Sequence, residues 1–260
     1  MDRAVIGAVA MLIASAVFAC VQHLPLIWDG AYQLLVTLTT DKPYVYQSRF
    51  HTWLLWWPTV WTARVTSDPI AISLAYGLPF LLGPAVSVGV TWWFVRREMP
   101  EAVVIAALGS LAITPGQVFV INDSVLQSHL FLPVLLGLMV RLTWTQWAVW
   151  GLLVVFQFAH QIGAGLLTVA MIVPIVGATM QPAERGRWTV RAAVVGALMI
   201  GAWMKVWWVM RPESAHYDSY AAEEMNWSTV MWRFEHGVWG WPIVGLLGVW
   251  GLALMMSMGT

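Results

Sequence analysis

Long apolar runs separated by short polar ones are the dominant pattern of this 260-residue chain. A helix that crosses the hydrocarbon core of a bilayer needs about 20 mainly apolar residues. Uninterrupted runs of this kind cover 4–22, 70–95, 102–121, 124–143, 188–209 and 239–258. The apolar stretch 146–180 is too long for one crossing and contains the polar pair His160-Gln161, so it predicts two short helices, over 146–160 and 162–180. The pattern predicts one all-helical domain over 1–260, with about eight transmembrane helices.

Two further segments, both in the first long connection, predict helices that lie at the membrane surface. In 29–40, Asp29, Gln33 and Thr37 recur at i, i+4 and i+8 with apolar residues opposite, which is typical of an interfacial amphipathic helix. The segment 51–66 holds four Trp and a Pro. It is short for a crossing and rich in the aromatic residues that anchor helices at the interface, so we expect an interfacial or re-entrant helix there.

Composition supports a membrane protein and excludes other classes. The chain is 60% hydrophobic and only 10% charged, and it contains 19 Trp, with a mean hydropathy of +0.72. Soluble domains carry about 25% charged residues. A net charge of zero provides no basic surface for nucleic acid. Because Cys20 is the single cysteine, a disulfide framework and a cysteine metal site are also excluded.

The basic residues suggest an orientation. Positive charge favours the cytoplasmic side of a membrane, and with a cytoplasmic N-terminus the inner ends carry Arg3, Arg96, Arg97, Arg141, Arg185, Arg187 and Arg191. We therefore expect an integral protein of the bacterial inner membrane. The chain stops directly after the hydrophobic segment 246–258, which leaves open that it is part of a longer protein.

Two acidic residues are the main candidates for chemistry on the outer side. Asp29 follows the first predicted span, and Asp123 lies in the tight turn between the third and fourth spans. Each has a structural alternative, because an aspartate at a helix start caps backbone N–H groups and complements the helix dipole. The functional interpretation is a general base or metal ligand at the membrane surface.

Other polar residues are expected near the same surface. Arg49 and Arg211 have the charge to hold a phosphate, as do Arg64 and Lys205, although basic residues at helix ends commonly extend towards lipid headgroups. His160 marks the break between two short helices. Within the fourth predicted span lie two more polar residues, Gln127 and His129, and a hydrogen-bonded structural role is favoured for the histidine.

The order of these features resembles that of a known membrane-enzyme family. An acid after the first span is followed by juxtamembrane helices, an aromatic run with a basic pair ends the second span, and a second acid opens a later span. The residues are Trp28-Asp29-Gly30-Ala31-Tyr32, Lys42-Pro43-Tyr44-Val45-Tyr46, Arg49-Phe50-His51 through Trp61, Trp92-Trp93-Phe94-Val95-Arg96-Arg97, and Asp123. Over roughly 1–180 this layout resembles the GT-C superfamily of glycosyltransferases, which includes protein O-mannosyltransferases and aminoarabinose transferases.

The resemblance implies transfer of a sugar from a lipid-phosphate-linked donor at the non-cytoplasmic face. Asp29 would be the base, and Asp123 would position the acceptor or, with Asp29, bind a divalent metal. The expected substrate-binding residues are Arg49, Tyr32, His160 and Arg211.

A different class remains open beside this one. The Trp content and the almost loop-free build also suit a non-catalytic transmembrane subunit of a larger energy-transducing or pigment-binding complex, in which both acids are helix caps. Its partners would be lipid and other membrane subunits.

Overall fold

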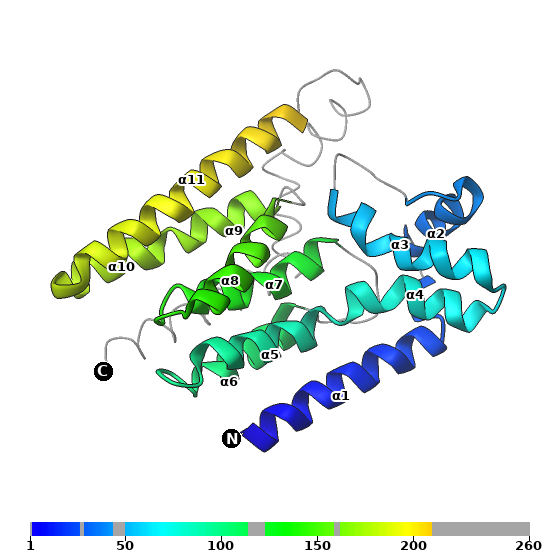
Figure 1. Cartoon of the computed structure of the whole chain (residues 1–260), viewed down its shortest axis with the longest axis horizontal. Helices are drawn as coiled ribbons and strands as arrows, with labels where there is room; N and C mark the ends of the chain where they lie inside the picture. The colour runs from blue at the N-terminus through cyan, green and yellow to red at the C-terminus, as the bar shows by residue number, and fades with distance from the viewer. Residues whose placement is uncertain (1, 27–28, 44–49, 114–122, 159–161, 210–260) are drawn as a thin grey trace, which may run out of the picture.

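All regular structure in the described part of the chain is helical. The computed structural model describes residues 2–26, 29–43, 50–113, 123–158 and 162–209 (Figure 1). Its helices are α1 (Asp2–Val21), η1 (Leu24–Leu26), α2 (Asp29–Thr40), α3 (Phe50–Val65), α4 (Pro69–Leu81), α5 (Gly83–Val95), α6 (Ala102–Ile113), α7 (Asp123–Gly137), α8 (Trp144–Gln157), α9 (Ile162–Ala170), α10 (Ile172–Met180), η2 (Pro182–Glu184) and α11 (Arg185–Val209). The all-helical class is confirmed for these residues.

Helix length identifies some of the predicted crossings. Among the described residues, three helical segments are long and apolar enough to cross a membrane, Asp2–Val21, Ile162–Met180 and Pro182–Trp207. A fourth is added if α4 and α5, which are bent by 43° at their junction, count as one broken span. These segments are compatible with an integral membrane protein. The predicted span 239–258 lies outside the described residues, and the eight-span count stays a prediction.

Three predicted ranges differ from the helices that form. The segment 162–180 is divided at Met171 into α9 and α10. The segment 70–95 is divided at Leu82 into α4 and α5, where Pro84 in the first turn of α5 has no backbone N–H to continue the helix. The segment 124–143 is helical only to Gly137. The next carbonyls, from Leu138 to Val140, are instead bonded by arginines of α11.

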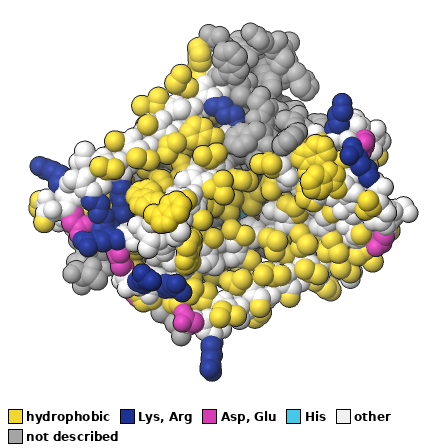
Figure 2. Space-filling view, viewed as in Figure 1, with side chains coloured by type: hydrophobic (Ala, Val, Ile, Leu, Met, Phe, Trp, Pro, Cys, Tyr) yellow, Lys and Arg dark blue, Asp and Glu magenta, His cyan; other side chains and the backbone are white. Residues whose placement is uncertain are grey.

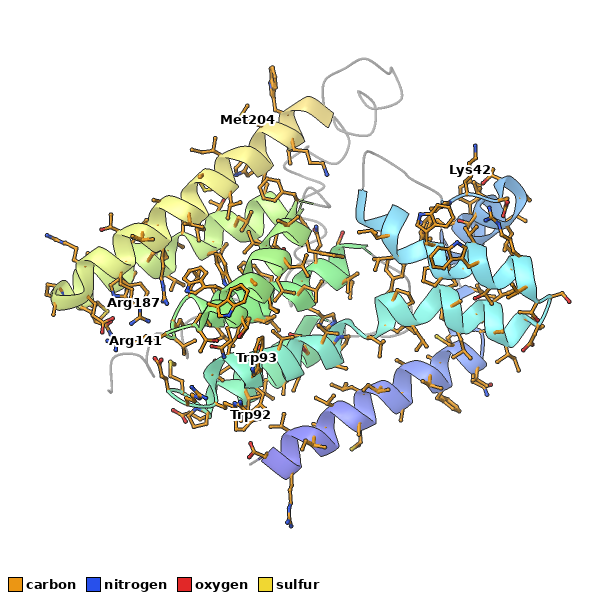
Figure 3. The ribbon with its side chains drawn as sticks, in the orientation of Figure 1. Lys42, Trp92, Trp93, Arg141, Arg187 and Met204 are labelled. Carbon is orange, nitrogen blue, oxygen red and sulfur yellow. The ribbon has the colours of Figure 1, made fainter. Side chains whose placement is uncertain are left out.

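One end of the helix bundle collects the predicted inner arginines, and we call it the arginine end. The turns after α5, α7 and α10 meet there, on the left of Figure 1. The backbone N–H of Arg141 donates to Glu98 at 2.9 Å, and its guanidinium donates to Glu184 at 2.8 Å. Arg187, labelled beside Arg141 in Figure 3, also pairs with Glu184. The start of α1 belongs to this end, because Val5 packs against Val88 and Val103.

Arg191 is a buried arginine at the arginine end. Its guanidinium donates to the carbonyls of Leu138 and Val140, and neighbouring Arg187 donates to Met139 at 3.1 Å. The last carbonyls of a helix have no partner within it. Two arginines of α11 thus bind the chain as it leaves α7, where a positive charge also complements the helix dipole.

The opposite end begins where α1 meets α4. The Ser73 hydroxyl donates to the Cys20 carbonyl at 2.7 Å, and Gly77 lies against Cys20 and Pro25. Since α1 runs towards this end and α4–α5 runs back, the chain between them starts and finishes here. That connection contains α2 and α3. The indole of Trp56 holds α3 on α4, with ring centroids 5.9 Å from Tyr76 and 6.2 Å from Phe80.

Charged side chains follow the same division. On the face shown in Figure 2, Lys, Arg, Asp and Glu gather towards the two ends, and hydrophobic side chains cover the band between them. Exposed large apolar residues include Met11 and Phe18 of α1 and Ile200 and Met204 of α11. This distribution is the one that a lipid bilayer favours.

Replacement of Arg191 by Met should lower the free energy of unfolding by about 3 kcal/mol, because buried carbonyls lose a charged donor. Titration with SDS in mixed micelles measures this change. Arg185→Met, at an exposed position of the same helix, is the control and should have little effect. Equal losses in the two variants would contradict the role given to Arg191.

Gly77→Ala should destabilise the junction of α1 and α4. An added Cβ would lie 2.6 Å from the Cys20 sulfur and 2.7 Å from Pro25 Cγ, and overpacking of this kind costs about 2 kcal/mol. In Gly165→Ala the new methyl group meets open space, so stability should stay equal or rise. The same titration compares them, and an unchanged Gly77→Ala protein would refute the close contact.

Candidate functional site

Both candidate acids are the first residues of helices at the end opposite the arginines. Asp29 begins α2 and Asp123 begins α7, while their side chains lie outside what the structure describes. The direction of α7 is fixed by its contacts. Gln127 near its start bonds to Phe156 in the last turn of α8, and the chain just after its last turn meets the arginines. The two backbones thus begin at one end of the bundle.

The remaining predicted site residues are divided between described and undescribed parts. Arg49, His160 and Arg211 lie outside the described residues. Tyr32 is described, and its side chain is 59% exposed on α2. Their roles in substrate binding stay predictions.

The amphipathic helix α2 is oriented with polar residues towards the protein. Thr37 is fully buried and Gln33 is half-buried, beside the buried Leu34, whereas Tyr32 and Leu35 are exposed. The face that carries Gln33 and Thr37 therefore packs against the protein, and exposed apolar side chains on the other face are compatible with lipid contact. Asp29 has the same helical register as Gln33 and Thr37, at i, i+4 and i+8. The sequence showed this spacing, but only the packing shows which face is turned inward.

An ion pair links Asp41, the residue after α2, to Arg64 in the last turn of α3. The Arg64 guanidinium donates to the Asp41 carboxylate in a fork, with Nε–Oδ1 at 2.9 Å and Nη2–Oδ2 at 2.7 Å. The hydrogen bonds from Arg64 lower the pKa of Asp41 below its usual value, and the same bonds raise the pKa of Arg64. Because its charge is already paired, Arg64 is a weaker candidate for phosphate binding than the sequence suggested.

Buried polar side chains lie further inside the same end. Gln127 and Gln157 are fully buried and join α7 to α8. His129 is 1% exposed and lies beside Gly83 at the α4–α5 break. Neither of its ring nitrogens has a partner in the described structure, which differs from the hydrogen-bonded histidine expected. The Lys205 ammonium donates to the Phe158 carbonyl at 2.5 Å, just after the end of α8.

The described side chains do not supply a metal site. Among them, no three His, Cys, Asp or Glu groups are close enough to hold an ion. The expected ligands Asp29 and Asp123 lie outside that set, and metal binding by them stays a prediction.

Comparison with known proteins yielded no family model, no curated protein and no solved structure that matches this chain.

Asp41→Asn should loosen the last turn of α2, because the fork with Arg64 loses its charge. Hydrogen exchange in that turn should be faster than in the wild type at neutral pH. Since the pKa of Asp41 is lowered in the folded protein, the wild-type advantage is present above the unfolded-state pKa and is lost as pH falls through the lowered value. Asp68→Asn, at the α4 N-cap, should leave this turn unchanged. Equal rates of hydrogen exchange in wild type and Asp41→Asn would contradict a stabilising role of the Asp41–Arg64 ion pair.

Proposed function

We propose that the chain is an integral protein of the bacterial inner membrane with its arginine end in the cytoplasm. The support is physical. Apolar helices of spanning length carry arginines at one end, and positive charge favours the cytoplasmic side. Asp29 and Asp123 then begin helices at the non-cytoplasmic side.

At that side we propose a GT-C-like glycosyl transfer from a lipid-phosphate-linked sugar to an acceptor hydroxyl. The observation that carries this proposal is the common end of Asp29 and Asp123, together with the inward polar face of α2. An enzyme acting on a lipid-linked donor needs its base at the membrane surface, where the donor's head group lies while its tail stays in the bilayer.

The carboxylates and the arginines have separate roles in the proposed reaction. The Asp29 carboxylate takes the proton of the acceptor hydroxyl, whose oxygen then forms a bond to the anomeric carbon of the sugar. The bond from that carbon to the phosphate oxygen breaks, and the lipid phosphate leaves with the electron pair. Asp123 orients the acceptor. Arg49 and Arg211 stabilise the negative charge that develops on the leaving phosphate.

Asp29→Asn should abolish sugar transfer without loss of folded protein, because an amide cannot accept the acceptor's proton. Release of radiolabelled sugar from a polyprenyl-phosphate donor in proteoliposomes measures the rate, which should fall by at least about 100-fold. Asp68→Asn makes the same chemical change at the same end. Asp68 caps α4 by accepting from Ile70 N–H at 3.1 Å, and Asn is an equally good cap, so activity should persist.

Two outcomes would redirect the proposal. Full activity in Asp29→Asn would eliminate this residue as the base. A wild-type protein that transfers no sugar and copurifies with a stoichiometric membrane partner would instead support the alternative of a non-catalytic subunit, with both acids as helix caps.

A further inference from the structure

Three buried glutamines at the two ends of the bundle differ in how their amides are bonded. Gln146, at the arginine end, is fully satisfied. Its Nε2 donates to the Trp93 carbonyl at 2.7 Å, and its Oε1 accepts from the Thr143 N–H at 2.8 Å and the Thr143 hydroxyl at 3.1 Å. This residue shows how a glutamine is accommodated in the interior when its role is structural.

Gln127 and Gln157, at the opposite end, are only half satisfied. Gln127 Nε2 donates to the Phe156 carbonyl at 2.8 Å, and Gln157 Nε2 donates to the Gln127 backbone carbonyl at 3.4 Å. A carbonyl can face only the NH₂ side of an amide, so these contacts fix the orientation of both groups. Both Oε1 atoms are buried, and neither has a hydrogen-bond partner in the described part of the protein.

Such atoms are expensive to leave unpaired. A buried acceptor that has lost water and gained no donor carries its full desolvation cost, and buried polar groups in native proteins are nearly always bonded. Two of them on one helix–helix contact therefore indicate donors that the described residues do not supply. A ligand that supplies them must bring O–H or N–H groups into this contact.

The surroundings select among such ligands. A phosphate diester has no donor to offer two amide oxygens. A cationic amine is disfavoured by the Lys205 ammonium, which lies at the carbonyl of Phe158, the residue after Gln157. Uncharged hydroxyl groups remain, and Gln127 lies one helical turn from Asp123.

We propose that the amide oxygens of Gln127 and Gln157 bind hydroxyl groups of the sugar on the lipid-linked donor. The assignment rests on the proposed function, and it adds the residues that recognise the sugar as distinct from its phosphate. They are binding residues, which determine affinity for the sugar and take no part in the chemical step.

The test compares binding of sugar-bearing and sugar-free lipid by the whole protein in nanodiscs. Unfolding midpoints from intrinsic Trp fluorescence are titrated with polyprenyl phosphates that carry mannose or glucose, and with polyprenyl phosphate alone. At least one sugar-bearing lipid should raise the wild-type midpoint above the sugar-free lipid. Gln157→Met, which keeps the size but removes the acceptor, should weaken the apparent Kd for that lipid about tenfold.

A matched control and a second variant make the result decisive. Gln146→Met should lower the midpoint without lipid, because it breaks satisfied bonds, while it keeps the sugar-dependent rise. Gln127→Met tests the second oxygen and replaces Gln157→Met if that protein does not fold. Binding of both sugar-bearing and sugar-free lipid with unchanged affinity in these variants would overturn the proposal.

The control lipids separate this inference from the function on which it rests. A sugar-dependent rise that persists in Gln127→Met and Gln157→Met leaves the glycosyltransferase proposal standing and eliminates the two glutamines. A wild type that no sugar-bearing lipid stabilises beyond the sugar-free lipid contradicts the proposed function itself. In that case ordered water is the remaining O–H donor for the two oxygens, and the sugar assignment is wrong.

Discussion

The buried guanidinium of Arg191 is the contact on which the arrangement of the bundle depends. It donates to the carbonyls of Leu138 and Val140 and lies over the rings of Trp188 and Trp147, at 5.3 Å and 6.0 Å from their centroids. In a bilayer, backbone groups that leave a helix must find partners within the protein, because lipid supplies none. Arg191 meets that requirement and thereby fixes which end of α7 lies beside the start of α11.

The two ends of the molecule differ in how far their polar side chains are hydrogen-bonded. At the arginine end, the polar groups of Arg141, Glu98, Glu184 and Gln146 are bonded to one another or to backbone. At the other end, His129 and the oxygens of Gln127 and Gln157 are buried without partners among the described residues. The Arg187 Nε at the arginine end also lacks a partner among the described residues, so the two ends differ in degree. Unmet hydrogen-bonding capacity is more common where a protein binds something. The candidate acids begin helices at this second end.

Helix positions were largely predictable because they follow from local chemistry. Residues 29–40 became α2 with the predicted bounds, and α1, α3 and α11 begin within three residues of the predicted positions. The misses occurred where long-range contacts or proline intervene. Pro84 divides the predicted span 70–95, and α7 stops at Gly137 because the following carbonyls bond to arginines some fifty residues away. Hydropathy does not register either effect.

The sequence by itself determined that the chain is helical, apolar and provided with basic residues at intervals, since those properties depend only on residue type and spacing. It also showed that Asp29, Gln33 and Thr37 share one face of a helix. Tertiary structure decided that this face turns inward, that the arginines meet at one end, and that two of the three buried glutamines keep an oxygen without a partner among the described residues. Whether a buried amide is satisfied depends on donors from distant helices, and no local pattern encodes their positions.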